Sequence, residues 1–210
     1  MQRRDQLVYL SIGIVWLFHV SALIGIFLGY FEWFIVKTPL NLMVSFILLL
    51  TVGGKHAVRT LPYIILFAVL GFSVEWIGVH TGFPFGSYTY GNNLGIKLDG
   101  IPPMIGVNWA MLTVITGAIA FRYFKGWKAI LAGATLMVGI DFFIEPIAAP
   151  AGFWSWANDA IPVSNYIAWF VIAMFFHWIY MRFIRSYNFL FSVNLYLAQL
   201  LFFVALNLYL

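Results

Sequence analysis

Three carboxylic acids stand within long apolar stretches of this sequence: Glu75, Asp141 and Glu145. A carboxylate at mid-bilayer costs about 2.5–3.5 kcal/mol on insertion scales, so acids inside membrane spans usually serve a function. Asp141 and Glu145 are four residues apart and therefore share one face of a helix. In a low-dielectric environment such a pair tends to share one proton, which supplies an acid and a base for catalysis. The alternative is that each acid only bridges two helices.

Two aromatic segments lie close to these acids in the chain. The turn-rich segment GFPFGSYTYG contains Phe85, Tyr88 and Tyr90, and its two tyrosines alternate on one side of an extended stretch. Trp154 and Trp156 repeat this alternation further along the chain. Such rings are typical of the aromatic belt at a membrane interface. Because these clusters flank the acids, they also suit a pocket that tolerates positive charge on carbon.

The composition requires a membrane. The chain has 210 residues, of which 63% are hydrophobic and 9% are charged, whereas a soluble domain carries about 25% charged residues. This composition excludes a disordered chain, a nucleic-acid-binding protein and a soluble enzyme. We expect one all-α domain over residues 1–210, a polytopic membrane bundle of about seven helices with its catalytic core at about 62–182. The expected spans are 7–27, 40–52, 62–79, 101–120, 129–147, 163–181 and 189–208.

The basic residues predict the orientation of these spans. Nine of the eleven Lys and Arg residues fall at the N-terminus or in even-numbered loops, and only Lys37 and Lys97 fall in odd-numbered loops. By the positive-inside rule the N-terminus is cytoplasmic. The second span is short, and we expect it to begin near Trp33 with a kink at Pro39. The first apolar run is too long for a signal peptide, so we expect it to be retained.

This orientation brings polar groups from four helices to one depth. Glu75 lies near the outer end of the third span, and Asn108 and Trp109 lie in the outer half of the fourth. The acid pair lies near the outer end of the fifth span, which is expected to end or kink at Pro146. Asn165 lies near the outer start of the sixth. The sequence therefore predicts a polar cluster beneath the non-cytoplasmic surface.

Several kinds of chemistry are excluded by what the sequence lacks. There is no cysteine, so disulfides and thiolate sites are absent. The four histidines are scattered, and no metal site is expected. A retinal protein needs a lysine in its last span, but no lysine follows Lys128. The acid pair is similar to one diphosphate-binding motif of membrane prenyltransferases, whereas those enzymes use two.

The order of these motifs resembles that of the CruF-type carotenoid 1,2-hydratases, a family that includes archaeal hydratases of bisanhydrobacterioruberin. The resemblance extends from about residue 75 to residue 169, and the combination is more specific than any of its parts. The motifs are Glu75, Gly82-x-Pro84-Phe85-Gly86-x-Tyr88-x-Tyr90, Pro102 and Trp109, Asp141 with Glu145-Pro146, Trp154-x-Trp156, and Pro162-x-x-Asn165-x-x-x-Trp169.

The resemblance implies a hydro-lyase that adds water to the terminal C1–C2 double bond of an acyclic carotenoid end group, as in lycopene or γ-carotene. Protonation at C2 gives a tertiary carbocation at C1, water attacks that carbon, and the product is a tertiary alcohol. No cofactor is implied. The expected partners are a lipophilic carotenoid, water and the bilayer, without nucleic acid. The expected location is the cytoplasmic membrane of a prokaryote.

The residues are assigned roles under this hypothesis. Asp141 is the expected proton donor, Glu145 shares its proton, and Glu75 is the expected base that positions and deprotonates water; these assignments are interchangeable. The amides of Asn108 and Asn165 are expected to hold water or to orient the carboxyl groups. The expected end-group pocket is formed by Phe85, Tyr88, Tyr90, Trp109, Trp154 and Trp156.

Two other functions remain open at this stage. A carotenoid end-group cyclase would use the same acid and the same cation but would exclude water, and its product would keep the mass of the substrate. A non-catalytic carotenoid or lipid carrier, or a proton-coupled transporter, would need a polar path across both halves of the bilayer. The inner halves of the spans carry few ionisable groups, which counts against such a path.

Overall fold

The computed structural model describes residues 2–210, apart from the side chains at positions 2, 3, 55 and 56. This part of the chain forms eight helices and two short strands, so the predicted all-α polytopic bundle is confirmed. The elements are α1 (Gln2–Phe27), α2 (Phe31–Ile35), α3 (Thr38–Gly53), α4 (Lys55–Thr81), β1 (Tyr88–Tyr90), α5 (Pro103–Tyr123), α6 (Gly126–Ala148), β2 (Trp154–Trp156), α7 (Val163–Phe183) and α8 (Phe189–Tyr209).

Six of these helices, α1 and α4 to α8, are long and apolar enough to cross a membrane. The short second span that the sequence predicted is divided into α2 and α3. The chain breaks at Val36 and Lys37, two residues before the expected kink, and Pro39 stands in the first turn of α3, where its missing N–H costs nothing. The 16 residues of α3 extend about 24 Å, which is less than the hydrocarbon thickness of a typical bilayer.

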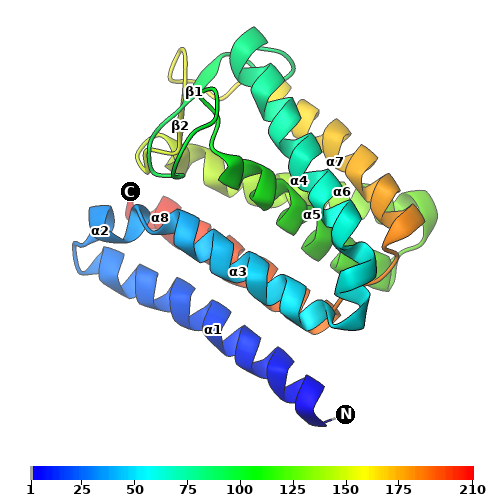
Figure 1. Ribbon diagram of the computed structural model, residues 1–210. Coiled ribbons are helices and arrows are strands. Elements are labelled where there is room, and N and C mark those ends of the chain that lie inside the picture. The colour runs from blue at the N-terminus through cyan, green and yellow to red at the C-terminus, as the bar shows by residue number, and fades with distance from the viewer. Residues whose placement is uncertain (1) are drawn as a thin grey trace.

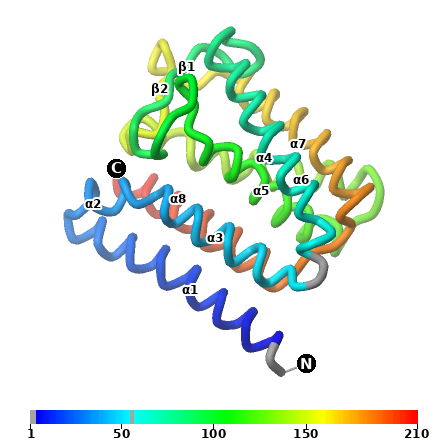
Figure 2. Tube along the Cα trace, in the orientation of Figure 1, coloured from blue at the N-terminus to red at the C-terminus, as the bar shows by residue number. Residues whose placement is uncertain are grey.

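The helices surround α5, which is the most buried of them and contacts α3, α4, α6, α7 and α8. Figure 1 shows α2, the two strands and the C-terminus toward one end of the bundle and the N-terminus at the other end. The turns from α5 to α6 and from α7 to α8 lie at the end away from the strands, as the Cα trace shows (Figure 2). Lys125 and Arg185 lie in these turns, and Lys128 lies in the first turn of α6. The side chains of Arg3 and Lys55, on which the predicted orientation also rests, lie outside the described residues.

The two strands form an antiparallel ribbon over the end of the bundle that lies away from the N-terminus. Thr89 pairs with Ser155, and the flanking pairs are Tyr88 with Trp156 and Tyr90 with Trp154. In both strands the aromatic side chains are buried and the central residue is exposed, which is the predicted alternation. The ribbon thereby joins the two long Gly- and Pro-rich loops that follow α4 and α6. It turns four aromatic rings toward the helices.

Candidate active site

Glu75 lies near the end of α4 and is held by three hydrogen-bond donors. Its Oε2 atom accepts hydrogen bonds from the hydroxyl groups of Tyr88 at 2.5 Å and Tyr90 at 2.6 Å. Its Oε1 atom accepts a hydrogen bond from the indole Nε1 of Trp109 on α5 at 2.8 Å. The Glu75 side chain is only 3% exposed. A buried carboxylate costs several kcal/mol unless donors satisfy it, and strand β1 with helix α5 supplies those donors.

The two tyrosines of β1 are protonated donors. Burial raises the pKa of Tyr88 and of Tyr90, and the negative charge of Glu75 raises both further. Both hydroxyl groups therefore keep their protons at physiological pH and direct them toward the carboxylate. Because a hydroxyl group accepts as well as donates, this side of the site can also pass a proton onward.

Glu145 on α6 has a matching shell supplied by the other strand. Its Oε2 atom accepts hydrogen bonds from the indole Nε1 atoms of Trp156 at 2.8 Å and Trp154 at 3.2 Å. Its Oε1 atom accepts a hydrogen bond from the side-chain amide of Asn165 on α7 at 2.8 Å. Indole groups donate hydrogen bonds but do not accept them. The three donors therefore hold this carboxyl group in a fixed position.

Asp141 lies one helical turn before Glu145 and has fewer donors. Its Oδ2 atom accepts a hydrogen bond from the same amide nitrogen of Asn165. The distance of 3.4 Å is long compared with the usual donor–acceptor range of about 2.7–3.2 Å. The side chain is 1% exposed. Asn165 thus bridges the two carboxyl groups of α6, and Asp141 is the least satisfied of the three acids.

Aromatic rings surround these acids. Trp109 stacks on Trp169 of α7 with ring centroids 3.8 Å apart and planes 18° apart. Tyr88 contacts Trp156 across the ribbon at a centroid distance of 5.0 Å, and Phe85 meets the Tyr88 ring edge-on at 6.1 Å. The cluster therefore presents ring faces beside carboxyl groups, an arrangement that attracts a cation.

A small cavity lies between the two glutamates. It is lined by both Glu75 and Glu145, by Asn165 and by the aromatic side chains of the ribbon. Its volume is about 10 Å³, which approaches the space that one water molecule needs. We call this space the water cavity.

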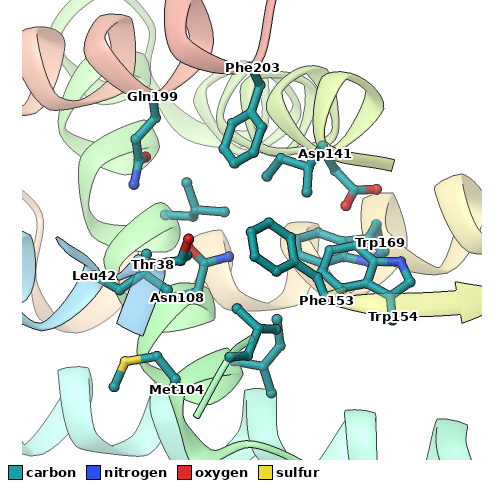
Figure 3. A pocket seen from close by; sticks show the side chains of 14 residues that line it. Thr38, Leu42, Met104, Asn108, Asp141, Phe153, Trp154, Trp169, Gln199 and Phe203 are labelled. Carbon is teal, nitrogen blue, oxygen red and sulfur yellow. The ribbon is translucent and has the colours of Figure 1, made fainter. Parts of the chain in front are cut away.

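A second, larger space lies on the Asp141 side, which we call the apolar chamber (Figure 3). Its volume is about 50 Å³, and Asp141 lines it whereas Glu75 and Glu145 do not. The chamber and the water cavity share one wall, formed by Ile105, Trp154 and Trp169. Asp141 therefore faces one side of this wall and the two glutamates face the other.

The structure places the sequence-predicted residues in two groups. Glu75, Glu145 and Asn165, with the four rings of the ribbon, Phe85 and Trp109, form one connected cluster that includes Asp141. Asn108 does not join the hydrogen bonds of this cluster and instead lines the chamber, where Figure 3 shows its amide directed toward the interior. The helix of the acid pair also continues two residues beyond Pro146, to Ala148.

Sequence reasoning missed three groups that line the site. Trp169 belonged to the motifs but not to the expected pocket, although it follows Pro162 at the seven-residue spacing that separates Pro102 from Trp109. Thr38 and Gln199 come from α3 and α8, outside the expected catalytic core. From the sequence alone, a single polar residue in an apolar helix that lines a cavity looks the same as one that contacts a neighbouring helix.

The arrangement suits proton transfer between carboxyl groups. Among residues 2–210, excluding the four undescribed side chains, no three His, Asp or Glu side chains form a group suited to a metal ion. The three acids instead face each other through an amide, indoles and phenols. Fold and site together define a multi-pass membrane protein with buried carboxyl groups beside an apolar chamber.

Comparison with known proteins identifies the family. The chain matches the family described as carotenoid biosynthesis protein over residues 34–210 and belongs to it, which confirms the family resemblance found in the motifs. It is also similar to bisanhydrobacterioruberin hydratase of Haloarcula japonica, with 25% identity over 115 residues. That match covers 50% of this chain and 39% of the relative. No solved structure matches the chain.

Proposed function

We propose that this protein is a carotenoid 1,2-hydratase, a hydro-lyase that adds water to the terminal C1–C2 double bond of an acyclic carotenoid end group. The observation that carries the proposal is the placement of Asp141 and the two glutamates on opposite sides of one aromatic wall. Addition of water needs an acid that faces the alkene and a base that faces the water. The family and the similar hydratase support the same reaction class.

Asp141 is the proposed acid. A carboxyl group with one long contact is better suited to carry a proton than one surrounded by three donors. Asp141 also lines the apolar chamber, where a hydrocarbon end group would lie. Its proton is transferred to C2 of the substrate, the π electrons form the new C–H bond, and C1 becomes a tertiary carbocation.

The aromatic wall and the water cavity complete the proposed reaction. The ring faces of Trp154 and Trp169 stabilise the cation at C1. A water molecule passes from the cavity between the glutamates into the chamber at the shared wall and forms the C1–O bond, and the proton that it loses passes back to Glu75. Return of that proton to Asp141 through water and Glu145 resets the site, while the Asn165 amide holds the two carboxyl groups of α6 in place. The balance is one alkene plus one water to one tertiary alcohol, without oxidation or reduction.

The water cavity favours hydration over cyclisation. A cyclase must keep water away from the cation, whereas here a space of about 10 Å³ lies between two hydrogen-bonded carboxyl groups. A carrier would need neither an acid nor a base at this place. We infer further that the enzyme acts in the cytoplasmic membrane of a prokaryote, with its N-terminus in the cytoplasm and a lipophilic carotenoid as substrate.

Expression in a lycopene-producing bacterium tests the proposed function. We expect a pigment that is heavier than lycopene by one water per hydrated end, detected by mass spectrometry. Asp141→Asn should lower the yield of this product by about 10²–10⁴-fold, the usual contribution of a general acid, with unchanged protein level in the membrane. A pigment of unchanged mass but altered absorption would identify a cyclase, and full hydration by Asp141→Asn would exclude Asp141 as the acid.

A further inference from the structure

A wide crevice opens on the lipid-facing side of the bundle, between α1, α2, α3 and α8. Its volume is about 370 Å³, and most of its lining is apolar. Leu17, Trp33 and Leu40 line it and are each more than half exposed, so it opens to the surroundings of the protein. Because α2 and the start of α3 lie at the ribbon end of the bundle (Figure 1), the proposed orientation places this opening in the outer half of the membrane.

The crevice adjoins the apolar chamber. Four residues line both spaces: Thr38 and Leu42 from α3, and Gln199 and Phe203 from α8. These four residues form a neck, and beyond the neck the chamber reaches Asp141. Figure 3 shows Gln199 and Phe203 extending from α8 toward the chamber, with Asp141 on the far side.

The neck contains a buried polar atom without a protein partner. The Oε1 atom of Gln199 has no hydrogen-bond partner among the described residues, and the Gln199 side chain is 6% exposed. Leaving a buried acceptor unpaired costs about 1–3 kcal/mol, so such atoms normally face a ligand or water. In the proposed reaction, water and the tertiary alcohol of the product both carry an O–H group that can donate a hydrogen bond to this atom of Gln199.

We propose that the crevice, the neck and the chamber form one lateral channel that holds the polyene chain of the substrate. The reactive end group lies in the chamber at Asp141, and the rest of the hydrocarbon passes the neck and leaves through the crevice into the outer leaflet. The identity of this ligand rests on the proposed hydratase function. Two adjoining spaces with a mainly apolar lining suit a long, thin and apolar molecule that reaches the acid directly from lipid.

The polarity of the channel fits this occupant. Most of the crevice lining is apolar, with Phe18, Phe202 and Phe203 among its side chains. It also contains the polar side chains of His19, Ser21, Lys37 and Asn41, and the polar groups of the neck and Asp141 follow further in. Burial of each methylene or methine group contributes to binding in proportion to its apolar area. A carotene that lies along the whole channel therefore gains far more binding energy than a short hydrocarbon with the same end group.

Blocking the crevice separates long from short substrates. Ala22→Trp places a large ring in the crevice on α1, away from the chamber, and Leu42→Trp narrows the neck. Leu10→Trp is the matched control, since Leu10 is 63% exposed on the same α1 helix and lines neither space. Hydration is measured with a full-length acyclic carotene and with a short acyclic isoprenoid that carries the same end group.

We expect Ala22→Trp to lower hydration of the carotene by about 10-fold or more, because most of the buried chain is displaced, and to leave the short substrate within about threefold of the unmodified protein. Binding is measured independently as the amount of carotene that co-purifies with Asp141→Asn protein. Adding Ala22→Trp to that variant should lower the amount of bound carotene, and adding Leu10→Trp should leave that amount unchanged.

The two readouts distinguish failure of the channel from failure of the function. Undiminished carotene binding and hydration by both blocked variants, or equal losses for long and short substrates in both, would overturn the channel. If the unmodified protein binds carotene but hydrates neither substrate, the proposed function is wrong. The co-purification experiment then still shows whether carotene binds in the channel.

Discussion

Two helix–strand–helix units of the molecule follow one plan. In the first unit, α4 carries Glu75, β1 supplies an aromatic pair, and α5 begins after Pro102 and carries Trp109. In the second unit, α6 carries Glu145, β2 supplies an aromatic pair, and α7 begins after a proline. The units meet at the antiparallel ribbon and at the tryptophan stack between α5 and α7. The site is therefore built between two similar halves.

The halves differ at two points. The ribbon supplies phenol donors to Glu75 but indole donors to Glu145. Four residues before the glutamate, the second unit has Asp141 and the first has Gly71, where the Trp109 side chain lies close. Each half therefore contributes one glutamate, but only the second half contributes an additional acid. That acid is on the side of the apolar chamber, so the asymmetry gives the site its direction.

Replacing each glutamate by glutamine tests this asymmetry most strongly. We expect Glu75→Gln to lower hydration by about 10²–10⁴-fold, because it removes the proposed base. Glu145→Gln should cost less, since Glu145 positions Asp141 and returns its proton but does not take the proton of water. Product formation in isolated membranes, normalised to protein amount, gives the ranking.

The opposite ranking of these two variants would assign the base to Glu145 and leave Glu75 as the positioning group. Equal and complete losses would indicate that both carboxyl groups act as one unit. Glu32→Gln is a suitable control, because Glu32 lies on α2, is exposed and is remote from the water cavity.

The phenol donors of the first half are expected to have an intermediate effect. Tyr88→Phe and Tyr90→Phe each keep the ring but remove one hydrogen bond to Glu75. A hydrogen bond to a charged group contributes about 1.5–3 kcal/mol, which corresponds to a decrease in hydration of about 10- to 100-fold. Tyr123→Phe, at a residue that is 69% exposed, should leave the rate unchanged. Normal rates in both single variants would mean that Trp109 and one tyrosine suffice to hold Glu75.

The close approach at Gly71 is expected to affect stability more than chemistry. A Cβ atom at this position would lie 2.5 Å from Cβ of Trp109, whereas at Gly139 it would meet only the Tyr196 hydroxyl at 3.6 Å. We expect Gly71→Ala to lower the stability by about 1–3 kcal/mol, as overpacking does, and Gly139→Ala to be neutral. Thermal unfolding in detergent compares the two variants, and equal melting temperatures would show that α5 moves away without cost.

Much of the fold was predictable because hydropathy is local. The sixth and seventh apolar runs began at residues 163 and 189, where α7 and α8 begin. The alternation in β1 and β2 was also visible, since side chains of a strand point alternately to its two faces. The pairing of Tyr88 with Trp156 was not, because the register of two three-residue strands far apart in the chain depends on the helices that bring them together.

The candidate site was predictable in its residue types but not in its internal arrangement. Buried acids in apolar spans pointed to Glu75, Asp141 and Glu145 on energetic grounds. Which donor serves which carboxyl group depends on side-chain packing between helices, and so does the separation of the chamber from the water cavity. The position of Gln199 in the neck could not be predicted either, because the neck forms only where α3 and α8 lie side by side.

The ribbon also has a consequence for the order in which the protein is made. Glu75 enters the bilayer with α4, and Glu145 follows with α6, before β2 has left the ribosome. Until Trp154 and Trp156 emerge, the second glutamate lacks its indole donors, and the newly inserted helices carry uncompensated acids in lipid. Closure of β1 on β2 therefore follows the insertion of α6, and a nascent chain that stops before residue 156 is expected to be a substrate for membrane quality control.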